Sequence, residues 1–170
     1  MDLKAATLQA AKAIRRGALK AGSMDTQVSS KSWHLLADIN AGGMLTFDSQ
    51  DAPAGAGGGT KERAYVSGFM SKEQAAAFVD TLNVRTDKVA MIVHPCQRFE
   101  TLGRIPVTVD RGRIFTRFPP YMGMTDHKHL RKQAGLRPGA DVAMVECLDA
   151  RWGRCAWKKG GLFADIVRCL

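Results

Sequence analysis

The sequence lacks the features that define several large classes of protein. It contains no run near the roughly 18 consecutive apolar residues that a membrane-spanning helix needs, which argues against an integral membrane protein. Its four cysteines in 170 residues lie mostly near the C-terminus and are too few for a secreted scaffold held by disulfides. We therefore expect a protein of a reducing compartment such as the cytoplasm.

Metal-binding and catalytic patterns are also scarce. No CxxC or HxxxH pair is present, and His127 and His129 beside Asp126 would point apart on a helix, so we predict neither a metal site nor a cofactor. Cys96 follows His94 by two positions, and a buried structural cysteine explains this pair better than a nucleophile with its base. The sequence therefore predicts no catalytic residues and argues weakly against an enzyme.

What the sequence does contain is the composition of a globular domain. Hydrophobic residues make up 45% and charged residues 24%, so the chain has enough apolar side chains for a core. We expect a basic amphipathic helix or arm over residues 1–23 and a single domain over 24–170. Residues 51–60 are rich in glycine and predict a flexible surface loop within that domain.

Helix and strand patterns alternate along the chain and predict an α/β or α+β fold. We expect one mixed sheet of about five or six strands, flanked by helices. Helices are predicted over 2–21, 33–40, 72–83, 127–134 and 162–170, and strands over 44–47, 64–69, 89–93, 105–109, 113–118 and 142–147. The continuous apolar run 89–93 is typical of a central strand, and Asp110-Arg111-Gly112 predicts the turn of a hairpin.

The formal net charge of +9 is concentrated in two regions. In the N-terminal region, basic residues spread over half of the predicted helix, and these are Lys4, Lys12, Arg15, Arg16 and Lys20. Three interpretations stay open for this segment: a helix packed on the domain, an organelle-targeting peptide, and a basic arm for nucleic acid or a partner.

The second basic region is the predicted hairpin and the helix after it. Arg111, Arg113 and Arg117 alternate with apolar residues, so one face of the second strand is expected to be basic and the other buried. The following helix adds Lys128, Arg131 and Lys132. Such a surface suits phosphates, and without a recognisable sequence-reading motif any binding to nucleic acid would be non-specific. An acidic protein subunit would fit equally well, and a solvated face that keeps the protein soluble is the simplest alternative.

Polar residues follow two predicted strands and flank a third. Because ligands gather at strand ends in α/β sheets, we expect these residues to form a pocket for a nucleotide or a phosphorylated ligand. The set is Thr46, Asp48, Ser49, Gln50, Arg63, Tyr65, Asp149, Trp152 and Arg154. The alternative is structural: the polar run at 48–50 satisfies turns, and Arg63 pairs with Asp48 or Asp149.

These motifs resemble a family of uncharacterised small domains. The resemblance rests on an aliphatic-Thr-x-Asp-Ser-Gln run, an Arg-x-x-Val-x-Gly-Phe run and an Asp-x-x-Trp-Gly-Arg run, and it spans residues 33–70 and 142–170. The resemblance implies relatives in actinobacteria, bacteriophages and large DNA viruses, and no established activity. The glycine-rich insert and the basic N-terminal segment depart from the family pattern and suggest added peripheral functions.

Three functional hypotheses follow. The first is a basic binding or assembly module, a component of a virion or large complex that contacts a polyanion or a neighbouring subunit. The second is a protein or enzyme that binds a nucleotide-like ligand through the polar cluster around Asp48, Arg63 and Arg154. The third is a subunit imported into an organelle by its N-terminal segment.

Overall fold

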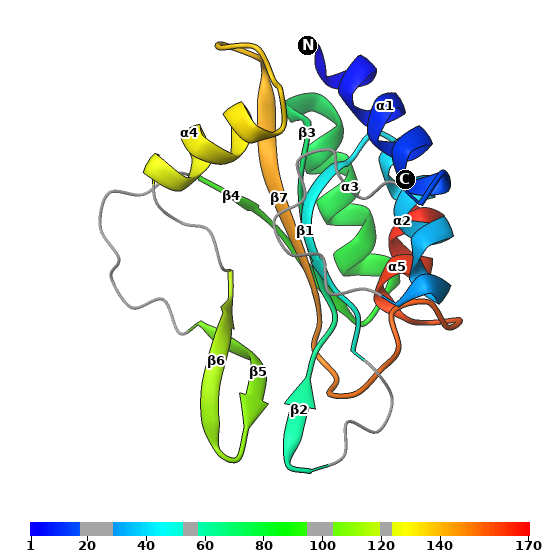
Figure 1. The fold of residues 1–170 in the computed structure, drawn as a ribbon, viewed down its shortest axis with the longest axis vertical. Coiled ribbons are helices and arrows are strands. Elements are labelled where there is room, and N and C mark those ends of the chain that lie inside the picture. The colour runs from blue at the N-terminus through cyan, green and yellow to red at the C-terminus, as the bar shows by residue number, and fades with distance from the viewer. Residues whose placement is uncertain (18–28, 53–57, 95–103, 120–123) are drawn as a thin grey trace.

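The strands of this protein form two antiparallel sheets. The computed structural model describes residues 1–17, 29–52, 58–94, 104–119 and 124–170. Its strands are β1 Leu45–Gln50, β2 Thr60–Glu62, β3 Tyr65–Ser71, β4 Lys88–Val93, β5 Ile105–Asp110, β6 Arg113–Phe118 and β7 Val142–Asp149. The larger sheet has the order β1-β3-β7-β4 and the smaller has the order β2-β5-β6 (Figure 1). The mixture of helices and strands is confirmed, whereas the expectation of a single mixed sheet is wrong.

Five α-helices accompany the sheets in the described ranges. They are α1 Leu3–Arg15, α2 Trp33–Ala41, α3 Lys72–Arg85, α4 Met124–Gln133 and α5 Leu162–Cys169, and a short 3-10 turn at Ser30–Ser32 precedes α2. Ser71 caps α3, because its hydroxyl accepts a hydrogen bond from the backbone N–H of Gln74 at 3.2 Å. Gly135, with a φ of +68°, follows the end of α4. None of the helices in these ranges is long and apolar enough to cross a membrane.

Two segments differ from their predicted extents. The first helix ends at Arg15 and not at residue 21, because Gly17 has a φ of +72° and turns the chain out of the helix. Residues 18–28, which include Lys20, lie outside the described residues. Of the predicted flexible loop, Asp51 and Ala52 are buried, Thr60 belongs to β2, and 53–57 lie outside the described residues.

The apolar run 89–93 forms most of β4, which is an edge strand and not the expected central strand. The internal position next to it belongs to β7, which pairs with both β3 and β4. The run is apolar because both faces of β4 are covered: Ala90 packs in the cluster beneath the helices, and Val93 packs in a cluster on the opposite face. An apolar run reports burial on two faces and does not distinguish an edge strand from an internal one.

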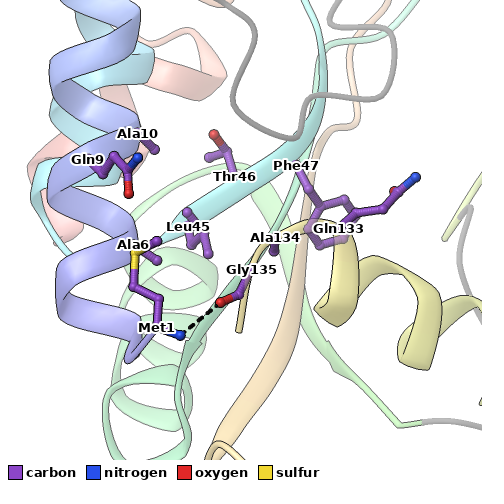
Figure 2. Close-up of a pocket in the computed structure, with 10 residues that line it drawn as sticks. All are labelled: Met1, Ala6, Gln9, Ala10, Leu45, Thr46, Phe47, Gln133, Ala134 and Gly135. Atoms are coloured by element: carbon purple, nitrogen blue, oxygen red, sulfur yellow. Dashed lines mark hydrogen bonds between the residues drawn. The ribbon is translucent and has the colours of Figure 1, made fainter. Parts of the chain in front are cut away.

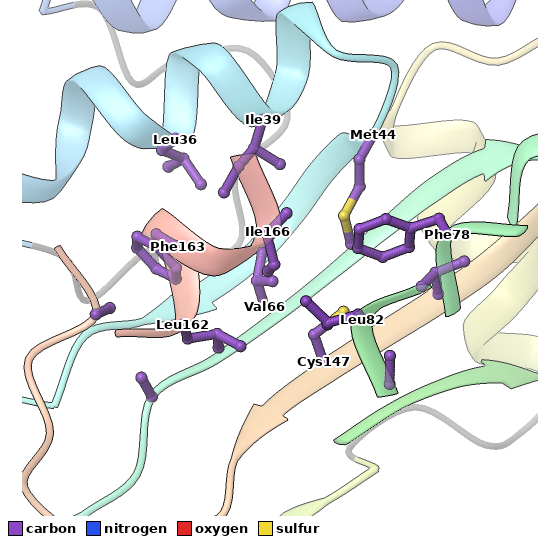
Figure 3. Close-up of a cluster of buried hydrophobic side chains, with 14 of the residues drawn as sticks. Leu36, Ile39, Met44, Val66, Phe78, Leu82, Cys147, Leu162, Phe163 and Ile166 are labelled. Atoms are coloured by element: carbon purple, nitrogen blue, oxygen red, sulfur yellow. The ribbon is translucent and has the colours of Figure 1, made fainter. Parts of the chain in front are cut away.

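One face of the larger sheet is covered by α2, α3 and α5 (Figure 3). The side chains that fill this interface include Leu36 and Ile39 from α2, Phe78 and Leu82 from α3, and Leu162, Phe163 and Ile166 from α5, packed on Val66 and Cys147. Burial of side chains of this size contributes about 1.5–3 kcal/mol each. This interface is the main hydrophobic core.

The opposite face carries two smaller apolar clusters. The first joins Phe69 and Met144 of the sheet to Leu130 of α4. The second joins Tyr65 and Leu148 of the sheet to Phe118 of β6 and Val107 of β5. Helix α4 and the β5–β6 hairpin therefore cover the same face of the larger sheet, at its two ends.

Helix α1 packs beside the edge strand β1. Ala6 and Ala10 belong to the cluster that contains Leu130, and Ile14 reaches the main core. A cavity of about 160 Å³ lies between α1, β1 and the end of α4, where the N-terminal ammonium of Met1 donates to the carbonyl of Gly135 at 3.1 Å (Figure 2). In this structure the basic helix is packed on the domain, the first of the three interpretations given above.

The strands β5 and β6 form the predicted hairpin. The two-residue turn consists of Arg111 at a φ of +45° and Gly112 at +81°, the sign pattern of the turns that match the twist of a hairpin. The base of the hairpin packs on the larger sheet through Val107 and Phe118, whereas its turn projects away from that sheet, and β6 lies at the edge of the smaller sheet (Figure 1). We call residues 105–118 the β5–β6 arm.

Candidate functional site

The polar run at residues 48–50 lies inside β1, not beyond the end of a strand as expected. The hydroxyl of Tyr65 donates to Asp48 Oδ2 at 2.8 Å, and Thr46 Oγ1 accepts from Asn40 Nδ2 at 2.7 Å. Ser49 is buried, and its hydroxyl has no hydrogen-bond partner among the described residues. All strand pairs are antiparallel, so the rule that ligands gather at the carboxyl ends of parallel strands does not apply here.

Gln50 connects the two sheets. Its Nε2 donates to Thr108 Oγ1 of β5 at 3.1 Å and to the carbonyl oxygen of Arg63 at 3.3 Å. Arg63 follows β2 and precedes β3, so this amide fixes the point where the chain leaves one sheet and enters the other. Gln50 therefore has a structural role.

Arg63 and Trp152 stack on each other. The guanidinium carbon lies 3.8 Å from the ring centroid, a geometry worth about 0.5–1 kcal/mol at an exposed site. The guanidinium also donates to the carbonyls of Ala150 at 2.9 Å and Pro106 at 2.6 Å. Burial lowers the pKa of Arg63, and the charge of nearby Asp149 opposes that shift. Among the described ion pairs Arg63 joins neither Asp48 nor Asp149, so carbonyl oxygens hold it where a carboxylate was expected.

Buried charges meet where β4 begins and β7 ends. The side chain of Lys88 is fully buried, and its Nζ lies 3.4 Å from Asp149 Oδ2, 3.4 Å from Asp165 Oδ2 and in contact with Asp87 Oδ1. Arg154 donates from Nη1 and Nη2 to the two oxygens of Asp87, each at 2.9 Å. We call this set the ionic clasp, and it consists of Asp87, Lys88, Asp149, Arg154 and Asp165.

The ionic clasp shifts the pKa values of Asp87 and Arg154. Hydrogen bonds from Arg154 and then from Lys88 hold the pKa of Asp87 well below its ordinary value, and the same bond to Asp87 raises the pKa of Arg154. Both ends of the clasp therefore stay charged at neutral pH. Because the clasp joins residues of β4, β7 and α5, it stabilises the packing of these three elements.

The structure brings together only part of the predicted ligand cluster. Arg63, Asp149, Trp152 and Arg154 lie at one end of the larger sheet, where Tyr65 pairs with Leu148. Thr46 lies toward the other end, because its neighbour Leu45 pairs with Phe69. Sequence reasoning missed Lys88 and Asp165, since one lysine at the start of an apolar run and one aspartate in a helix carry no distinctive signal.

The β5–β6 arm presents charge and apolar surface together. Arg111, Arg113 and Arg117 are exposed, and within the described part of the chain none of them forms an ion pair. Phe115 is 64% exposed and lies 6.0 Å from the guanidinium carbon of Arg113, and Ile114 is 41% exposed. The expected buried face of β6 is therefore limited to Phe118 at its base.

The other basic side chains lie on two separate helices. On α4, Lys128 and Lys132 are exposed, while Arg131 is partly buried and donates to the carbonyl of Ala140. At α1, Arg15 is bonded to Asp38 at 2.8 Å. The other basic residues of this helix and its C-cap are exposed and have no described ion pair, and these are Lys4, Lys12 and Arg16. Helix α1 and the β5–β6 arm lie at opposite sides of the molecule, so they do not form one surface (Figure 1).

The cysteines and histidines form no metal cluster in the described residues. Cys147 and Cys155 are buried and Cys169 is partly buried, and all three are free thiols. Burial raises the pKa of the Cys147 thiol, which keeps it protonated and unreactive. Cys96, which follows His94 in the sequence, lies outside the described residues.

These observations define a class: a small domain in which one antiparallel sheet is covered by helices and a second sheet projects a basic hairpin. Comparison with models of known families then identifies the family of this chain. Residues 2–168 match a domain of unknown function (DUF6919), and the chain belongs to this family. The matched range includes α1 and both sheets. A comparison with curated proteins gave no match.

Proposed function

We propose that this domain binds nucleic acid without sequence preference through the β5–β6 arm, as a component of a virion or another large nucleoprotein complex. The observation that carries the proposal is a set of three exposed arginines with no described ion pair, interleaved with exposed apolar side chains: Arg111, Arg113, Ile114, Phe115 and Arg117. Unpaired guanidinium groups are free to bind phosphate, and displaced counterions drive such binding.

The turn of the arm supports this proposal. Arg111 has a φ of +45°, a conformation that glycine or asparagine adopts more readily than arginine. Unusual backbone conformations of this kind cost of order 1 kcal/mol and concentrate at functional sites. A basic side chain at the tip therefore has a conformational cost, and phosphate binding would offset it.

The apolar residues favour single strands over duplexes. Phe115 is 64% exposed, and a base stacked on an aromatic ring contributes about 1–3 kcal/mol. Bases are accessible for stacking in a single strand and are covered by their neighbours in a duplex. Lys128 and Lys132 are exposed on α4, which covers the same face of the larger sheet as the arm, and their charges extend the positive potential.

The test measures binding of a fluorescent oligothymidine of about 20 nucleotides by anisotropy, at salt concentrations from about 50 to 200 mM. The arm variant R111A/R113A/R117A should bind at least roughly tenfold more weakly, with a salt slope reduced by about 2. The matched control K4A/K12A/R16A removes the same charge from α1 and should bind nearly as wild type does. Phe115→Ala should weaken single-strand binding more than duplex binding.

Two results would overturn this proposal. Equal losses in the arm and control variants would show that net charge alone attracts the oligonucleotide. Absence of binding at the lowest salt concentration would remove nucleic acid as the ligand. Circular dichroism melting of each variant separates either result from unfolding.

A neighbouring protein subunit is the second candidate. β6 is an edge strand, and its residue Ile114 is 41% exposed, so an acidic strand from a partner could pair with this edge. A nucleotide-like ligand in the predicted cluster has less support, because the guanidinium groups of Arg63 and Arg154 already bond to carbonyls and to Asp87. Organelle import has less support because α1 is packed on the domain.

A further inference from the structure

A second candidate site lies near the end of β4, apart from the β5–β6 arm. A cavity of about 350 Å³ is lined there by the end of β4, by the starts of β7 and α3, and by α4. Pockets of this size hold small organic molecules. Its apolar lining includes Phe69, Ile92, Val142 and Met144.

Among the residues that the structure describes, the polar side chains lining this cavity are Lys72, His94, His127 and Arg131. All four are of basic type, and no described lining residue carries a carboxylate. Lys72 is also the first residue of α3, so the positive end of that helix dipole lies at the rim. An apolar lining with a basic rim fits a molecule with an apolar body and one anionic group.

Two of the basic groups are held in ways that leave them able to bind an anion. Lys72 Nζ contacts Asp141 Oδ1 at 2.6 Å, but the two side chains are 65% and 76% exposed, so this pair has little net stability. Arg131 donates from Nη2 to the carbonyl of Ala140, and a guanidinium has five N–H donors in total. The remaining donors can form bidentate hydrogen bonds to a carboxylate or a phosphate.

We propose that this cavity binds a small organic anion, a carboxylate or phosphate monoester on an aromatic or branched aliphatic body. The apolar body would lie against Met144 and Ile92, and the anionic group would meet Lys72 and Arg131 at the rim. This site shares no residue with the β5–β6 arm, so it stands or falls independently of the proposed binding of nucleic acid.

The experiment uses the full chain labelled with carbon-13 at its methionine methyl groups, with the Met144 resonance identified by its loss in Met144→Leu. Benzoate and phenyl phosphate are the anionic probes, inorganic phosphate lacks the apolar body, and benzyl alcohol lacks the charge. Either anion should shift the Met144 resonance saturably at millimolar concentration or below. The tighter of the two identifies the preferred anionic group.

Charge variants locate the anionic group. K72Q/R131Q should weaken the binding of the preferred anion by roughly tenfold, which corresponds to about 1.4 kcal/mol. Lys72→Gln alone changes an exposed side chain, so it should leave the fold intact. If the double variant is unstable, binding of the preferred anion is compared between this single variant and wild type. K12Q/R16Q removes the same number of charges at exposed positions of the N-terminal segment, and this matched control should bind as wild type does.

Three results would overturn the proposal. Equal shifts with benzyl alcohol and with the anions would mean that the pocket recognises apolar bodies only. Equal shifts with inorganic phosphate would mean that surface charge alone attracts the probes. No shift of the Met144 resonance with any probe would mean that the cavity is not a binding site.

Discussion

Arginines have opposite surroundings in the ionic clasp and in the β5–β6 arm. Arg154 donates two hydrogen bonds to Asp87, lies 3.6 Å from Asp149 and is mostly buried. Arg113 and Arg117 are exposed and form no described ion pair. The two regions lie within one chain of net charge +9, and this net charge does not tell which arginines are paired and which are exposed.

The difference separates positive charge that holds the fold from positive charge that is available to a ligand. In the ionic clasp, removal of one partner leaves a buried carboxylate without compensation, which costs stability. In the arm, removal of a guanidinium leaves only water behind, which costs little. Stability and binding measurements on matched variants should therefore diverge between the two regions.

The largest effect is expected at Lys88, the fully buried centre of the ionic clasp. Lys88→Met keeps the side-chain length but removes the buried ammonium between Asp149 and Asp165, and should lower the free energy of unfolding by about 3–5 kcal/mol. Urea denaturation measures this change. Lys128→Met, at an exposed position of α4, should stay within about 0.5 kcal/mol of wild type. A Lys88 variant as stable as the Lys128 variant would show that the clasp does not hold the sheet.

Two phenylalanines of β6 give the second comparison. Phe118 is fully buried against the larger sheet and Phe115 is 64% exposed. Phe118→Ala should destabilise the protein by about 3–5 kcal/mol because it leaves a cavity, and Phe115→Ala by less than about 0.5 kcal/mol. Thermal and urea unfolding of the two variants measure the difference. Similar losses in both would contradict the division of the arm into a packed base and a free end.

The smallest effect concerns the pH dependence of the ionic clasp. The pKa of Asp87 is lower in the folded protein than its ordinary value of 3.8, so its contribution to stability is present above that pH and is lost as the pH falls toward the folded pKa. Arg154→Ala should destabilise the protein at pH 7 by on the order of 1 kcal/mol, because Asp87 is partly solvated. The gap between variant and wild type should narrow as the pH falls below 3.8. Unfolding curves recorded across the acid range test this, and a constant gap would contradict it.

The sequence predicts the elements of this fold better than their assembly. The hairpin at 105–118 and the helix capped by Ser71 are where turn and cap residues predict them. The first strand extends three residues beyond its predicted end at Phe47, because aspartate, serine and glutamine are typical of turns and their strand partners are distant in sequence. The split into two sheets depends on contacts such as Gln50 with Thr108, which no local pattern reports.

The candidate sites differ in the same way. Arg113 and Arg117 share one face of β6 and are exposed, as alternation along a strand predicts, but the opposite face, predicted to be buried, is exposed at Ile114. The cavity near β4 combines residues from positions 69 to 144, and only the folded chain brings them together. Its methionine and histidines have no spacing that distinguishes them from core residues.

The internal position of β7 gives the molecule a built-in reference for hydrogen exchange. Backbone amides of Val145 and Cys147 lie between β3 and β4, so they should exchange with solvent only through global unfolding. Amides on the outer edge of β6 have no neighbouring strand in the smaller sheet and should exchange through local opening. A ligand on the arm should therefore raise the protection of β6 and β7 together, because binding to the folded state also opposes global unfolding. A ligand bound elsewhere should protect β7 and leave the local exchange of β6 unchanged.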